Sequence, residues 1–165
     1  MLYLVPDREI APSLDWHQRF LHLAATCPSK LLQAYYQAGA VAPDTPIAET
    51  PLLALDLETT GLNPNLHDII SIGLVPVSGN NIYTSQARHW LVKSPSGLPA
   101  DSVQYHRITH DALANAPDLL EILPGFLEQI AGKILLVHYA DIERKFLHSA
   151  LLTRLGTGLE IPVID

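Results

Sequence analysis

Two acidic residues stand close together in an otherwise apolar run. Residues 52–58 read Leu-Leu-Ala-Leu-Asp-Leu-Glu and include no Lys or Arg. Because side chains alternate across a strand, Asp56 and Glu58 would share one face, and the leucines would lie on the other. Burying both charges is costly unless something pairs them. A divalent cation held by carboxylate oxygens, Mg²⁺ or Mn²⁺, would pair them. The alternative is a strand end open to water, with both acids hydrated.

The residues that follow favour the cation. Thr59-Thr60-Gly61-Leu62 ends the strand in a turn where Gly61 permits close backbone approach. Asp68-Ile69-Ile70-Ser71-Ile72-Gly73 then opens a second strand. Residues 55–62 and 68–73 together resemble the first exonuclease motif of the DEDD superfamily of 3′→5′ exonucleases. The resemblance is to its DEDDh type, which includes the epsilon proofreading subunit of bacterial DNA polymerase III.

Two later segments extend this resemblance in the same order. Residues 105–113 are similar to the family's turn between the third strand and the next helix. Residues 135–147 are similar to the second exonuclease motif, the strand-to-helix corner that carries the third acid. The resemblance covers roughly residues 50–165 and implies a ribonuclease H-like fold.

The resemblance also implies a site and a mechanism. Asp56 would bridge two cations, Glu58 would hold the one that activates water, and Glu143 would support the shared site. The cofactor would be Mg²⁺ or Mn²⁺, and the substrate a single-stranded 3′ end of DNA or RNA. The residues expected to contact that substrate are Thr59, Thr60, Gly61, Leu62 and His138.

The chain departs from the family pattern in three places. Tyr139 stands where most members have Asn, and Glu143 stands where they have Asp. Asp141 is a rival third ligand, but its place at a helix start favours a role as helix cap. The third motif, a general base followed by a fourth acid, does not occur after the expected strand 161–165. We therefore expect a C-terminally incomplete domain with little or no nuclease activity.

The elements that must position these residues follow from periodicity and turn signals. Helical spacing is expected over 14–25 and 29–38, followed by a Pro-containing linker at 42–46. Residues 1–50 would form a helical extension, and residues 51–165 a mixed α/β domain whose three antiparallel strands precede parallel strands with flanking helices. The expected strands are 52–58, 69–77, 82–92, 133–137 and 161–165. The expected helices are 111–115 capped by Thr109, 117–130 with a kink or restart at Pro124, and 141–155 ending at Gly156.

Composition limits the remaining choices. The 165 residues include 17 Asp and Glu against 10 Lys and Arg, which argues against a large duplex-binding surface. Bound cations could still supply positive charge at a strand end. One cysteine and no apolar segment long enough for a signal core or a membrane span favour a cytoplasmic protein. The function expected is DNA-directed proofreading or repair, with a polymerase as a possible partner. The alternatives are an RNA-trimming enzyme and a non-catalytic interaction module.

Overall fold

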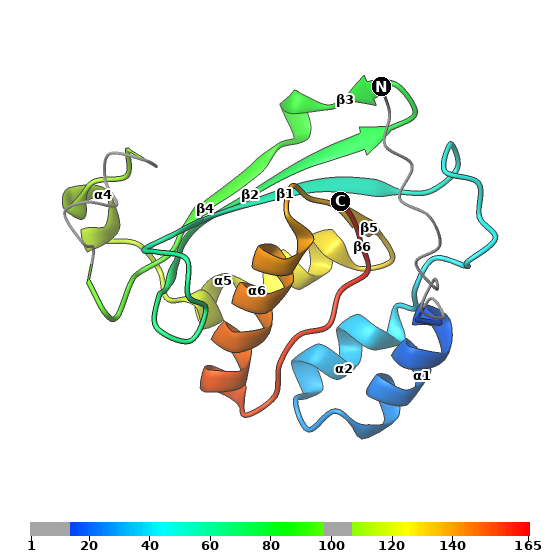
Figure 1. The fold of residues 1–165 in the computed structure, drawn as a ribbon, viewed down its shortest axis with the longest axis horizontal. Coiled ribbons are helices and arrows are strands. Elements are labelled where there is room, and N and C mark those ends of the chain that lie inside the picture. Colours follow the sequence, from blue (N-terminus) through cyan, green and yellow to red (C-terminus); the bar gives the residue numbers. More distant parts are fainter. Residues whose placement is uncertain (1–13, 98–106) are drawn as a thin grey trace, which may run out of the picture.

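The computed structural model describes residues 14–97 and 107–165. Their strands form one mixed sheet in the order β3-β2-β1-β5-β6, with β4 also paired to β2 (Figure 1). Strand β1 is antiparallel to β2 and parallel to β5, and β5 is parallel to β6. The strands are β1 (Leu52–Thr59), β2 (Ile69–Ser78), β3 (Asn81–Ile82), β4 (Arg88–Leu91), β5 (Ile134–Leu136) and β6 (Val163–Ile164).

The prediction of a single third strand over residues 82–92 is wrong. The structure divides it into β3, a 3₁₀ turn at Thr84–Gln86, and β4. The Tyr83 N–H donates to the Pro76 carbonyl at 2.9 Å, but Pro76 has no N–H to return the bond. The antiparallel ladder is therefore interrupted at Pro76, and the chain rejoins β2 where Arg88 pairs with Leu74.

The helices begin at side-chain caps in most cases. Thr109 caps α4 by accepting from the Ala112 N–H, as expected, and Asp118 and Glu121 form a capping box at α5. Helix α5 runs through Pro124 without restarting. Within residues 14–97 and 107–165, no helix is long and apolar enough to cross a bilayer. The helices are α1 (Trp16–Thr26), α2 (Lys30–Gln37), α4 (His110–Ala114), α5 (Leu119–Ile130) and α6 (Ala140–Leu155).

Helices α5 and α6 lie along one face of the sheet (Figure 1). Leu53, Leu55 and Leu57 of β1 are buried in the same hydrophobic cluster as Phe126 of α5 and Phe146 of α6. The alternation expected for β1 is therefore present, with its leucines in the core. The buried leucine face fixes the register of β1, because a slip of one residue would place the acids in the core instead.

The helical pair α1 and α2 joins this core at the segment that leads into β6. Phe20, Tyr35 and Tyr36 are buried in the same cluster as the strand leucines. The Arg19 guanidinium donates to Glu160 at 2.8 Å, and the Glu160 N–H donates to the Tyr36 hydroxyl at 3.0 Å. The hydrogen bond from Arg19 holds the pKa of Glu160 below its usual range. The boundary at residue 50 remains a prediction, although the core crosses it.

Candidate functional site

Asp56 and Glu58 project from β1 on the face opposite its buried leucines. Asp56 is exposed and Glu58 is half-buried. They pair across the sheet with Gly73 and Ser71 of β2. Gly73 has no side chain that could cover the neighbouring Asp56 carboxylate. Two of the predicted acids are thus placed together at the surface of the sheet.

Glu143 reaches this strand because β5 is short. Strand β5 pairs with β1 only as far as Ala54, and the chain then turns into α6. The first turn of α6 consequently lies beside the part of β1 that β5 leaves uncovered, and the Leu57 backbone forms a hydrogen bond with the Glu143 carboxylate. The side chain of Glu143 is buried, with the residue only 4% exposed.

The Glu143 carboxyl is strongly perturbed. Its pKa is raised to about 7, chiefly by burial and then by the negative charges of Asp56 and Glu58. The hydrogen bond from Leu57 opposes that rise but does not cancel it. Its second oxygen, Oε2, is buried without a hydrogen-bond partner. A buried carboxylate with an unpaired oxygen beside two further acids has the chemistry of a divalent-cation ligand.

The acids do not form a closed cage in the described residues. Within residues 14–97 and 107–165, no three acidic, histidine or cysteine side chains are grouped closely enough to hold a metal ion. The unpaired Glu143 oxygen and the all-oxygen donor set, rather than a preformed cage, are what fit Mg²⁺ or Mn²⁺.

Asp141 lies apart from these acids. Its carboxylate is exposed and forms an ion pair with Lys145 at 2.7 Å. The expectation that Asp141 caps the helix is wrong, because the N-cap is Tyr139, whose side chain makes no capping bond. The N–H groups of Tyr139 and Ala140 instead donate to Asp165. Asp141 still gains from the favourable dipole at the helix start.

Some residues at the turn after β1 stabilise the turn by hydrogen bonds, and others are exposed to solvent. The Thr60 hydroxyl is buried and accepts from the Asp68 N–H at 2.9 Å, so this side chain secures the turn. The Thr59 hydroxyl donates to the Gly61 carbonyl at 2.8 Å. Leu62, by contrast, is 79% exposed. His138 is also exposed, at the corner between β5 and α6. Leu62 and His138 are therefore free to meet a ligand.

Gly61 is required by its neighbour His67. A Cβ added at Gly61 would lie 2.5 Å from the His67 ring, which accepts from the Asn63 N–H at 3.1 Å. We expect Gly61→Ala to lower the free energy of unfolding by about 1 kcal/mol, because the ring must leave that bond. Chemical denaturation would measure the loss. In a His67→Ala background the same glycine substitution should cost almost nothing, and an equal cost there would contradict this account.

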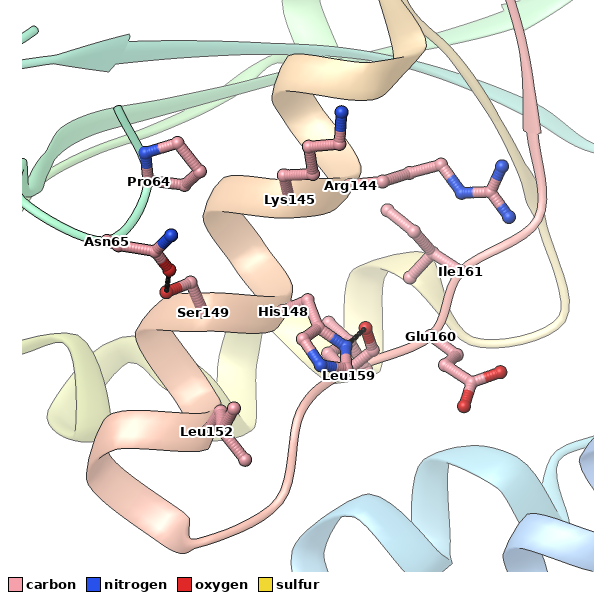
Figure 2. Close-up of a pocket in the computed structure, with 10 residues that line it drawn as sticks. All are labelled: Pro64, Asn65, Arg144, Lys145, His148, Ser149, Leu152, Leu159, Glu160 and Ile161. Atoms are coloured by element: carbon pink, nitrogen blue, oxygen red, sulfur yellow. Dashed lines mark hydrogen bonds between the residues drawn. The ribbon is translucent and has the colours of Figure 1, made fainter. Parts of the chain in front are cut away.

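A pocket of about 340 Å³ lies on another side of α6 (Figure 2). Asn65, from the loop after β1, accepts there from the Ser149 hydroxyl at 3.3 Å. The Nδ1 atom of the His148 ring lies 3.3 Å from the Leu159 carbonyl oxygen. None of the three predicted acids lines this pocket. The hydrogen bond between Asn65 and Ser149 connects the loop after β1 to α6, and the pocket is separate from the acidic site.

The sheet order and the placement of the acids define a class. A mixed sheet with two acids on its central strand, and a third on the helix that follows β5, is a ribonuclease H-like nuclease domain. Residues 53–151 match the sequence model of the family described as Exonuclease, and the chain belongs to that family. The family expected from the motifs is thereby confirmed.

Curated relatives agree with the family. The chain is 32% identical over 122 residues to a PolC-type DNA polymerase III of Thermotoga maritima, covering 74% of this chain and 9% of the relative. It is 35% identical over 100 residues to the DNA polymerase III epsilon subunit of Haemophilus influenzae, covering 58% of this chain and 39% of the relative. The chain thus spans well under half the length of these relatives.

Solved structures confirm the fold class. The nuclease domain of 3′hExo, a DEDDh family member, superposes with a TM-score of 0.55 at 20% identity, covering 64% of this chain and 60% of that chain. Cell-death related nuclease 4 superposes with the same TM-score of 0.55 at 15% identity, covering 64% and 40%. At these identities the likeness concerns the fold, which is the ribonuclease H-like sheet that the sequence predicts.

Proposed function

We propose that this chain is the exonuclease domain of an enzyme that removes nucleotides from single-stranded DNA 3′ ends by a two-metal mechanism. The observation that carries the proposal is the buried Glu143 carboxylate, with its unpaired oxygen, beside Asp56 and Glu58. An unpaired buried acid is costly, and its retention is characteristic of functional sites. Membership of the exonuclease family gives that site its reaction class.

In this proposal, one set of residues binds the cations and another set contacts the nucleic-acid strand. Asp56, Glu58 and Glu143 would hold Mg²⁺ or Mn²⁺. Bound cations of this kind activate the attacking water and stabilise the leaving oxygen. The backbone of residues 59–62 would approach the terminal nucleotide, with the exposed Leu62 side chain against its base. His138 would face the scissile phosphate from the β5–α6 corner.

We propose DNA rather than RNA as the substrate on the basis of relatives that are more than 30% identical to this chain. Those relatives are named as DNA polymerase III proteins, which also makes a polymerase the expected partner. An RNA-trimming enzyme is the second candidate, supported by the solved 3′hExo domain bound to rAMP. A non-catalytic interaction module fits less well, because three acids are present at the site and two of them raise the pKa of the third.

The test compares two labelled strands. The complete gene product is incubated with 5′-labelled single-stranded DNA, or RNA of the same sequence, in the presence of MgCl₂ or MnCl₂. We expect a ladder that shortens from the 3′ end, forms faster on DNA, and disappears with EDTA. Faster shortening of RNA would select the second candidate. Internal cuts only, or no products with either metal, would contradict the proposal.

A further inference from the structure

The first turn of α6 is held by Asp165, at the end of β6. The Tyr139 N–H donates to Asp165 Oδ1 at 2.8 Å, and the Ala140 N–H donates to Asp165 Oδ2 at 3.0 Å. We propose that Asp165 is a positioning residue that fixes the start of α6 and so places Glu143 beside β1. This inference rests on the proposed function, because it concerns the geometry of the same cation site.

The sheet brings Asp165 to this position. Strand β6 is parallel to β5, and Leu136 pairs with Ile164. The Val137 N–H continues the ladder by donating to the Ile164 carbonyl at 3.0 Å. Carboxyl ends of neighbouring parallel strands meet at one edge of a sheet, so the residue after β6 lies where β5 gives way to α6. The Asp165 carboxylate therefore meets the helix start directly.

The contact also holds an unfavourable backbone conformation. Tyr139 has a φ of 75°, in the left-handed region that residues other than glycine seldom adopt. No side chain within α6 caps its N-terminus. Two hydrogen bonds to one carboxylate compensate for both features, since bonds to a charged acceptor are stronger than neutral ones. The same bonds hold the pKa of Asp165 below its usual range.

The helix transmits this restraint to Glu143. Ala140 is the first residue of α6, and Glu143 follows three residues later on the same turn. Hydrogen bonds within the helix fix that spacing, so a change in the helix start moves the Glu143 carboxylate as well. Glu143 is buried, and its carboxylate forms a hydrogen bond with the Leu57 backbone of β1. The alignment of Glu143 with Asp56 thus depends on Asp165.

The experiment measures Mn²⁺ binding by the 165-residue chain with titration calorimetry. Asp165→Ala should weaken binding on the order of 10-fold, the size typical of residues that orient metal ligands. Asp165→Asn keeps one acceptor oxygen, so its Mn²⁺ affinity should lie between those of the wild type and Asp165→Ala. Asp118→Ala is the control, because Asp118 is the N-cap residue of a different helix, α5. That variant should lose stability and keep its Mn²⁺ affinity.

Amide hydrogen exchange supplies a second readout that does not depend on the cation. In Asp165→Ala the amides of Tyr139 and Ala140 should exchange faster, while those later in α6 keep their protection. Wild-type affinity in Asp165→Ala, together with lost affinity in Asp56→Asn, would overturn this inference and leave the cation site standing. Failure of the wild-type chain itself to bind Mn²⁺ would overturn the cation site and this inference with it.

Discussion

Glu143→Gln should stabilise the cation-free protein by about 3 kcal/mol at pH 8 and by less than about 1 kcal/mol at pH 5. The reason is the Glu143 pKa, which burial and the neighbouring acids raise to about 7 from an ordinary value of 4.5. Gln imitates the protonated acid and removes the cost of the buried charge. Urea denaturation in EDTA at several pH values would measure the difference.

The sign follows from proton binding. Between the unfolded and folded pKa values of Glu143, the folded state holds a proton that the unfolded state has lost. Wild-type stability should therefore fall as the pH rises from about 5 to about 7.5, and the Gln variant should lack this decline. Asp141→Asn is the control, because Asp141 lies two residues earlier on the same helix but is exposed. Equal pH curves for wild type and Glu143→Gln would refute the buried-charge explanation.

Asp56→Asn should weaken Mn²⁺ binding at least about 100-fold, since it replaces a charged ligand of the proposed site by a neutral amide. Thermal unfolding detects the change. At a concentration 100 times the wild-type Kd, Mn²⁺ should stabilise the wild type by about 2.7 kcal/mol. A variant that binds 100-fold more weakly should gain only about 0.4 kcal/mol at the same concentration.

Asp44→Asn supplies the control for that measurement. Asp44 is an exposed acid in the linker between α2 and β1, so its loss changes the net charge by the same amount without touching the site. It should keep the full stabilisation by Mn²⁺. An equal loss in Asp44→Asn would indicate general counterion attraction rather than a site, and undiminished stabilisation in Asp56→Asn would exclude Asp56 as a ligand.

The predictable parts of the fold are those that local patterns determine. Alternation in β1, the Thr109 cap and the stop of α6 at Gly156 each depend on a few adjacent residues, and the structure contains all of them. The interruption between β3 and β4 was missed because it depends on Pro76 of a different strand. The restart that was one of the outcomes predicted at Pro124 did not occur, since one face of α5 is buried along its length and tertiary packing holds the helix together.

The site shows the same division. Asp56 and Glu58 could be placed on one face from spacing alone, and Glu143 from the motif it resembles. The role of Asp165 could not be found in that way, because it depends on hydrogen bonds to residues 139 and 140, more than twenty positions earlier. The available signal was an acid at the end of the strand expected over residues 161–165, next to the strand that precedes α6. The prediction assigned the capping role to Asp141 instead, because Asp141 is nearer to the helix start in the sequence.

The contact between Arg19 and Glu160 has a consequence for the order in which the protein forms. These residues are 141 positions apart, and their ion pair closes α1 and α2 onto the segment before β6. A ribosome releases the chain from the N-terminus, so Arg19 emerges long before its partner exists. Phe20 can pack against Tyr35 and Tyr36 once α1 and α2 have formed, but the pair joins the rest of the core only later. Completion of the core, and with it the alignment of the acids, therefore follows the release of residue 160 from the ribosome.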